Sequence, residues 1–487
     1  MLPSSLSALP YCARVWLLSL ATLPFIAACA TGTPPRAPAS APPPAYQSAP
    51  SGAPAQALDQ WWKLYRDPQL SALTSRALAQ GFSVREALAR LEESRALNAV
   101  SLSRFDLQGD LQGNAEHRQT RDLEGGNAAG GAGPGIGSGA DRTSTSRTAS
   151  LSLPVSWELD FVGRRSVTQR GAEADLEAAR FDVQAARAAI AAEVARALFQ
   201  ARGLHVQRDE ARETVRIQQD LMAVVTERVK RGLAPSSEVD RVAGDLAQAE
   251  AQAADLAAAL LAARRALLAV VGDGTAALTE LETSATLGAA PAIPVALPGE
   301  LLTRRPDVRT SLASIEKAAS QVRLAELEFY PRLTLTPGIG LSAQGGSIDS
   351  RSAFWSVGAG LVVPMLDRPR LMAQLAIEGA RAEQAVLAYE RSVQNAFSEA
   401  DQALTRLQAD QRRVVTLAGG EVRARAAYDA ALRRYQLGFA DLQELLDGER
   451  SWRAARSTLT VAKVDALQRS VQVFQALGGG WNASQTQ

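Results

Sequence analysis

Few side chains in this sequence could carry out covalent or acid–base chemistry, and their spacing argues against an enzyme. The chain of 487 residues has two histidines, His117 and His205, and neither falls in a metal-ligand or nucleophile pattern. We expect His117 in a loop and His205 on a long helix. The glycine-rich run 125–139 lacks the strand and helix that would frame a phosphate site. The residues predict no catalytic site, no cofactor and no bound metal.

Cys29 is the residue with a predicted modification. Arg14 precedes an apolar run, 15–25, and then Ile-Ala-Ala-Cys at 26–29, which has the small residues that a signal peptidase requires. This pattern resembles the lipobox of bacterial lipoproteins, in which the cysteine is lipidated and becomes the first mature residue. The alternative is an ordinary secretory signal that contains a cysteine. Ala30 stands where an inner-membrane retention signal would have Asp, which favours the outer membrane.

The charge balance gives no reason to expect nucleic acid as a partner. Net charge is +1 and both signs are spread along the chain, so no basic surface is predicted. Residues 34–54 are rich in Pro, Ala and Ser and predict a semi-extended tether. Beyond it, no stretch approaches the roughly 18 to 20 apolar residues of a membrane helix. Any segment that crosses a membrane must therefore do so as strands.

The body of the chain is predicted to be a two-fold internal repeat. Residues 228–272 and 434–478 match at an offset of 206 residues without a gap, and each begins Arg-x-x-x-Gly. The predicted boundaries are a signal peptide at 1–28, a lipid anchor and tether at 29–57, a first repeat at 58–272, a linker at 273–294, a second repeat at 295–481 and a tail at 482–487.

Four segments alternate apolar with small or polar residues at a period of two: 105–115, 149–157, 333–343 and 355–361. Their lengths are close to the roughly 9 to 11 residues of a tilted transmembrane strand. The smallest membrane barrels have about eight strands, so these four predict a barrel shared between chains. A soluble sandwich with one wet face is the alternative, but no further strands are available to cover these. Loops are predicted at 116–147 and 344–352.

Long coiled-coil helices are predicted between the hairpins. Segment 165–231 contains no proline, and 370–437 is its counterpart in the second repeat. In 239–270 the apolar residues recur at alternating steps of three and four, which indicates a helix-to-helix seam. The fold class predicted from these patterns is an α+β membrane protein with long helices and four strands per chain.

Four motifs in order carry a resemblance to a known family. They are Trp-Trp-Lys-Leu-Tyr-Arg-Asp-Pro at 61–68, Ser-Trp-Glu-Leu-Asp-Phe-Val-Gly-Arg at 156–164, Leu-Leu-Thr-Arg-Arg-Pro-Asp-Val at 301–308 and Ala-Leu-Gly-Gly-Gly-Trp at 476–481. In these motifs the chain resembles the TolC-like outer-membrane efflux proteins, and among them the NodT-type lipoproteins. The resemblance implies a homotrimer in which each chain gives four strands to a twelve-stranded β-barrel and its helices to a periplasmic α-barrel tunnel.

The resemblance also implies the function of a passive exit duct in a tripartite efflux pump. A periplasmic adaptor would join the duct to an inner-membrane transporter, commonly of the RND type, that exports drugs, metals or other toxic solutes. The duct would be lipid-anchored in the outer membrane and extend into the periplasm. An outer-membrane duct for type I protein secretion is the close alternative, and a structural coiled-coil lipoprotein without a pore is another.

A periplasmic gate is implied in the helix after the second glycine turn. Acidic side chains of the family narrow the tunnel there, and the matching positions are Glu444 and Asp447, with first-repeat counterparts Glu238 and Arg241. Stacked carboxylates in a narrow tube favour cations, and Arg241 is placed to pair with an acid across the aperture. The alternative for Glu444 is a capping box with Asp441 as N-cap, and for Asp447 a solvated helix face.

The turn tips resemble the surfaces that meet the adaptor in this family. The residues concerned are Arg231, Gly232, Leu233, Leu437, Gly438 and Phe439. Each glycine is also expected to end its helix in the left-handed conformation. Some relatives hold the closed state with an Arg two residues after the second glycine, where this chain has Ala440, so any latch here must use other residues.

Overall fold

The computed structural model describes residues 43, 45–46, 58–121, 143–293, 298–345 and 349–480. Two compact units are formed, one from Ala96–Glu173 and Glu316–Gln384, the other from the described parts of Ala37–Arg95, Ala174–Ile315 and Ala385–Gln487. The predicted signal peptide, Cys29 and the glycine-rich run lie outside the described residues. The helices are η2 Leu58–Tyr65, α2 Pro68–Gln80, α3 Phe82–Ser103, α4 Arg164–Lys230, α5 Ser236–Val271, η3 Leu278–Glu280, η4 Pro298–Glu300, α6 Leu301–Arg304, α7 Pro306–Leu327, α8 Arg368–Gln436 and α9 Leu442–Ala476.

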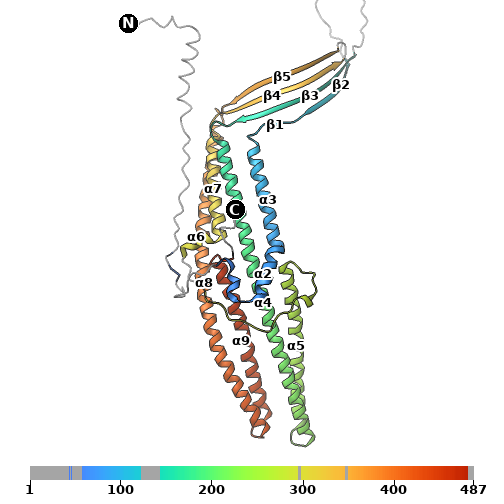
Figure 1. Ribbon diagram of the computed structural model, residues 1–487, viewed down its shortest axis with the longest axis vertical. Helices are drawn as coiled ribbons and strands as arrows, with labels where there is room; N and C mark the ends of the chain where they lie inside the picture. The colour runs from blue at the N-terminus through green and yellow to red at the C-terminus, as the bar shows by residue number, and fades with distance from the viewer. Residues whose placement is uncertain are drawn as a thin grey trace, which may run out of the picture. The chain divides into compact units, whose positions relative to one another are not determined.

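The first unit carries an antiparallel sheet (Figure 1). Both β1 and β2 pair with β3, which pairs with β4, and β4 pairs with β5. The register sets Leu151 opposite Leu341 and Ile339 opposite Trp355, so the predicted alternation places apolar side chains on one face. The strands are β1 Gln108–Gly109, β2 Gln112–Arg121, β3 Thr143–Leu159, β4 Arg332–Gly345 and β5 Ser350–Val362.

The strands extend beyond their predicted ends. Strand β2 runs to Arg121 and β3 begins at Thr143, so the predicted loop 116–147 was wrong at both ends. His117 consequently lies in β2 and not in a loop. The predicted strand 105–115 begins later and is divided into β1 and β2. Residues 116–121, which extend β2, are all polar and show no alternation with apolar residues. Only their backbone pairing with β3 identifies them as strand.

Long helices dominate the second unit, where the predicted seam of α5 is confirmed. Helices α4 and α8 start and end within two residues of the predicted 165–231 and 370–437. Val242, Ala249, Leu260 and Leu267 of the α5 seam are buried, and its remaining members are half-buried. Among the described residues, no helix combines the length and apolar character needed to cross a membrane.

A hydrophobic core joins the first and last described elements of the second unit. The Trp61 ring of η2 stacks on Phe474 of α9, with ring centroids 5.3 Å apart, and both side chains are fully buried. The amide of Gly480 donates to the Leu58 carbonyl at 3.0 Å. This core therefore packs η2, near the start of the described chain, against α9 and the residues that follow it at the end.

Candidate functional site

The candidate site lies at the tips of two helical hairpins, α4–α5 and α8–α9, which end at the bottom of Figure 1. Gly232 and Gly438 have φ of +72° and +79°. The amides of Gly232 and Leu233 donate to the carbonyls of Val229 and Arg228, both at 2.9 Å. Gly438 and its successor repeat this pattern in the second hairpin. Both turns are Schellman motifs, which require glycine at the left-handed position.

Apolar side chains project from the tips into solvent. The exposed fractions are 66% for Leu233, 72% for Leu437 and 73% for Phe439. Arg231 is also exposed, and its Nε pairs with Glu227 at 2.9 Å. The tip residues predicted to meet the adaptor are therefore accessible in the single chain, while their contact with an adaptor stays a prediction.

Glu444 lies in the first turn of α9 and pairs with an arginine that the sequence reasoning missed. The Asp441 carboxylate accepts from the Glu444 amide at 2.8 Å, so Asp441 is the N-cap as predicted. The reciprocal half of the capping box was wrong, because the Glu444 carboxylate instead binds Arg434. Arg434 also donates to the carbonyl of Phe439 at 3.2 Å. A charged guanidinium outcompetes the backbone amide for this carboxylate and fixes the turn.

Asp447 is mostly exposed and lies near a bridge between the two hairpins. Its Oδ1 is 3.7 Å from Arg450 of the same helix. Arg450 donates to both oxygens of Asp245 on α5, at 2.9 and 2.8 Å. Asp447 and Asp245 thus share one guanidinium. The i, i+3 spacing of Asp447 and Arg450 was visible in the sequence, whereas the contact with Asp245 was not.

Glu238 and Arg241 occupy the first turns of α5. Glu238 is half-buried, while Arg241 is exposed and has no ion-pair partner within the described ranges. Burial raises the pKa of Tyr435 on α8, and the charge of Glu238 raises it further. The Arg228 guanidinium lies over the Tyr435 ring at 4.8 Å and opposes this shift in the pKa. Glu238 therefore acts on the opposite hairpin, whereas Arg241 contacts neither Glu444 nor Asp447 in one chain.

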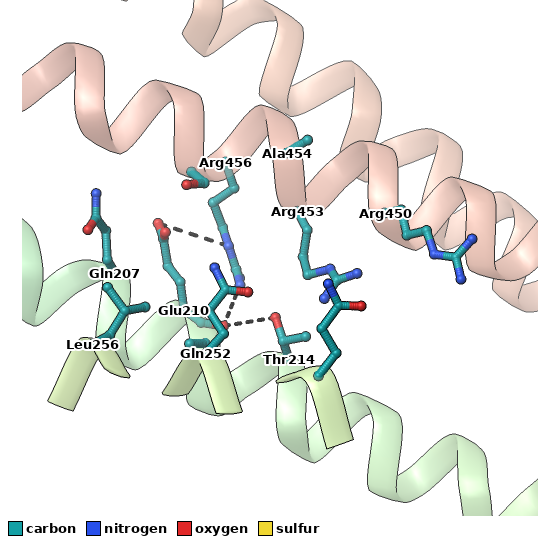
Figure 2. Close-up of a pocket in the computed structure, with 12 residues that line it drawn as sticks. Gln207, Glu210, Thr214, Gln252, Leu256, Arg450, Arg453, Ala454 and Arg456 are labelled. Carbon is teal, nitrogen blue, oxygen red and sulfur yellow. Dashed lines mark hydrogen bonds and ion pairs between the residues drawn. The ribbon is translucent and has the colours of Figure 1, made fainter. Parts of the chain in front are cut away.

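A polar cavity of about 350 Å³ lies further along the hairpins, between α4, α5 and α9 (Figure 2). Burial raises the pKa of the Glu210 carboxyl, which accepts from Thr460 at 2.8 Å. Arg456 donates to the Glu210 carbonyl at 2.8 Å, and Thr214 donates to the same oxygen at 3.0 Å. Contacts of this kind join α9 to α4 through buried polar groups.

Neither histidine forms part of a reactive cluster. His205 Nε2 lies 3.6 Å from Asp209, and burial lowers the pKa of its imidazole. In the described part of the chain, no three or more His, Cys, Asp or Glu side chains are grouped to hold a metal ion. At the tip of α9, Asp441 caps the helix, while Glu444 and Asp447 lie beside arginines.

The chain combines long antiparallel helical hairpins with a sheet that exposes an apolar face. The profile of the outer membrane efflux protein family matches residues 73–273 and 297–479, so the chain belongs to this family. This match confirms the family resemblance predicted from the sequence motifs. Members of the family are channels rather than enzymes. The chain is therefore an efflux protein of the outer membrane.

Named relatives match over nearly their whole length. The pyoverdine export outer membrane protein OpmQ of Pseudomonas putida is 30% identical, covering 94% of this chain and 95% of OpmQ. SilC of Salmonella typhimurium, described as a probable outer membrane lipoprotein, is 27% identical and covers 96% of this chain and 99% of SilC. The solved outer-membrane channel OprN is 28% identical with a TM-score of 0.76, covering 93% of this chain and 100% of that structure.

Proposed function

We propose that three copies of this chain form a single outer-membrane exit duct with a shared twelve-stranded barrel. The sheet of the first unit carries this proposal, because within the described strands β2 pairs only with β3 and β5 only with β4. Unpaired edges are costly in lipid and are satisfied by joining other copies. Apolar side chains on one face are 45–78% exposed in the single chain: Leu151, Ile339, Leu341, Trp355, Val357 and Leu361.

The duct is passive, and a periplasmic adaptor connects it to an inner-membrane transporter of the RND type that supplies the energy. Exported solutes are small toxic compounds or drugs. OpmQ, which is named for pyoverdine export, supports a small-molecule cargo over the protein-secretion alternative. The family's efflux description supports the same choice.

The acidic residues at the tip of α9 form the proposed gate. Glu444 and Asp447 from three copies would surround the aperture, with Glu238 and Arg241 beside them. The exposure of Asp447 and the absence of an ion-pair partner for Arg241 in the described single chain support contacts between copies. A ring of carboxylates favours cations and resists closing unless neutralised.

The exposed turns form the proposed adaptor surface. Its residues are Arg231, Gly232, Leu233, Leu437, Gly438 and Phe439. The two turns share one hydrogen-bond pattern, which also supports the proposed internal repeat. Repeated tips on three chains would present six similar surfaces to adaptors.

Lipidation of Cys29 is the proposed means of anchoring. Cys29 lies outside the described part of the chain. The proposal therefore rests on the lipobox-like pattern at 26–29 and on the description of SilC as a probable lipoprotein. Mass spectrometry of the mature protein tests it directly. A mature N-terminus at Cys29 with attached acyl chains is expected, and an unmodified cysteine would refute the anchor.

Single-channel recording in planar bilayers tests the duct. The full-length protein, purified in neutral detergent, is expected to run as a trimer and to conduct ions with a preference for cations. A folded protein that stays monomeric contradicts the shared barrel. A folded trimer that never conducts, even with its adaptor present, contradicts the duct.

A further inference from the structure

A groove separate from the polar cavity runs over α9 between α4 and α8, and its volume is about 330 Å³. We call it the α4–α8 groove. Its walls combine aliphatic and aromatic side chains with charged ones, and buried Leu445 and half-buried Leu432 are among the aliphatic residues. Leu221 and Val224 of α4 face them across the opening. A concave site of this size, with apolar walls and a few polar groups, suits a small organic molecule.

Buried polar groups at this groove are left without partners. Tyr435 lines it and is 3% exposed, and its hydroxyl has no partner in good hydrogen-bond geometry among the described residues, although Arg228 lies close to it. The Glu449 carboxylate also lines it and is 2% exposed. Its Oε2 receives only a long contact of 3.4 Å from Gln218, whose own Oε1 is buried and unpartnered in the described chain. Buried polar atoms without partners indicate room for a group not supplied by the chain.

The charged side chains around the groove favour a bound cation. Asp429 is half-buried and has no ion-pair partner in the described ranges. Glu449 pairs with Arg453, whose Nε lies 3.1 Å away, and the more distant Arg450 and Arg456 also act on its charge. Both carboxylates lie close enough to Tyr428 to raise the pKa of its hydroxyl, in addition to the larger effect of burial.

Carboxylates outnumber the arginines that line the groove. Arg216 pairs with Glu213 at 2.5 Å and with Asp220 at 3.3 Å. Arg425 lies over the Trp452 ring at 5.5 Å. Four carboxylates line the groove against these two guanidiniums, so an anionic ligand meets a net negative charge, whereas a cation meets an excess of carboxylate oxygens.

We propose that the α4–α8 groove binds a small hydrophobic ammonium cation. The positive group lies between the carboxylates of Asp429 and Glu449, and the apolar body packs against Leu221 and Leu432. The groove is formed within one chain, so this inference stands apart from the trimeric duct. A bound cation contacts α4 on one side and α8 and α9 on the other, and so stabilises their packing.

Isothermal titration calorimetry of the full-length protein in neutral detergent tests the groove. The probe is benzylammonium chloride, whose N–H groups can donate to the carboxylates, and sodium benzenesulfonate is the anionic control. We expect one cation per chain and no binding of the anion. Asp429→Asn and Glu449→Gln should each weaken cation binding by about tenfold, because each removes a charge-assisted contact. Asp255→Asn, an exposed carboxylate of α5 outside the groove, should leave binding unchanged.

A second variant separates lost binding from a disturbed fold. Leu432→Trp fills the groove with an aromatic ring and should abolish cation binding while the far-UV circular dichroism spectrum stays that of the wild type. Equal binding of the anion overturns the proposal. So does unchanged cation affinity in Asp429→Asn and Glu449→Gln, or the absence of binding by a folded wild-type protein.

Discussion

Removing the guanidinium of Arg450 tests whether ion pairs between the hairpins hold the proposed channel closed. Arg450 of α9 donates to both oxygens of Asp245 on α5 at 2.8 and 2.9 Å. About half of the Arg450 side chain is exposed, so we assign this pair about 1 kcal/mol, less than the roughly 3 kcal/mol of a buried charged contact. Arg450→Ala should therefore favour separation of the hairpins.

The expected effect is multiplied in a trimer. If three chains open together, about 1 kcal/mol per chain becomes about 3 kcal/mol, or roughly a hundredfold rise in the ratio of open to closed channels. Single-channel recording measures this ratio directly. Arg423→Ala, which removes an exposed arginine of α8 with no ion pair in the described chain, is the matched control.

A double-mutant cycle isolates the contact. Asp245→Asn should reproduce the effect of Arg450→Ala, and combining the two should add little, because both remove the same pair. Wild-type open probability in both single variants would refute the reasoning. Additive effects would show that each residue acts through other contacts.

Three further predictions concern the tip and its buried acid. Glu444→Ala with Asp447→Ala should raise conductance and reduce cation preference in bilayers, and an unchanged current would leave these acids as helix caps and surface charges. Gly438→Ala should lower the stability of the folded protein by about 1 kcal/mol through backbone strain, whereas the helical control Gly379→Ala should raise its melting temperature. Burial raises the pKa of the Glu449 carboxyl above its ordinary value of 4.5, so the folded state binds a proton there more tightly than the unfolded state does. The free energy of unfolding therefore falls as the pH rises from 4.5 through the raised pKa. Glu449→Gln should melt above the wild type at neutral pH, with the difference shrinking on acidification; a constant difference would contradict this account.

Local patterns in the sequence predicted the elements well. The absence of proline from 165–231 predicted α4, and steps of three and four predicted the buried seam of α5. Gly232 and Gly438 were predicted to end their helices, and both have positive φ. These features follow from backbone sterics and short-range side-chain spacing, which a sequence displays directly.

Contacts of the site were harder to predict. Glu444 binds Arg434 across the turn, so no i, i+3 or i, i+4 rule connects them. Arg450 and Asp245 belong to different hairpins and meet only because α5 and α9 pack near each other. The strand extension beyond Ala115 was missed for a related reason, because its pairing with β3 depends on two segments together.

The stacking of Trp61 on Phe474 has a consequence for the order of events during biogenesis. A chain delivered to the periplasm from its N-terminus exposes the indole of Trp61 early, but the ring that covers it arrives only with the end of α9. The core of the second unit therefore cannot close until almost the entire chain has been translocated. Until then its aromatic surface stays open to aggregation or to a chaperone, and a nascent chain cut short at its C-terminus would be left in that state.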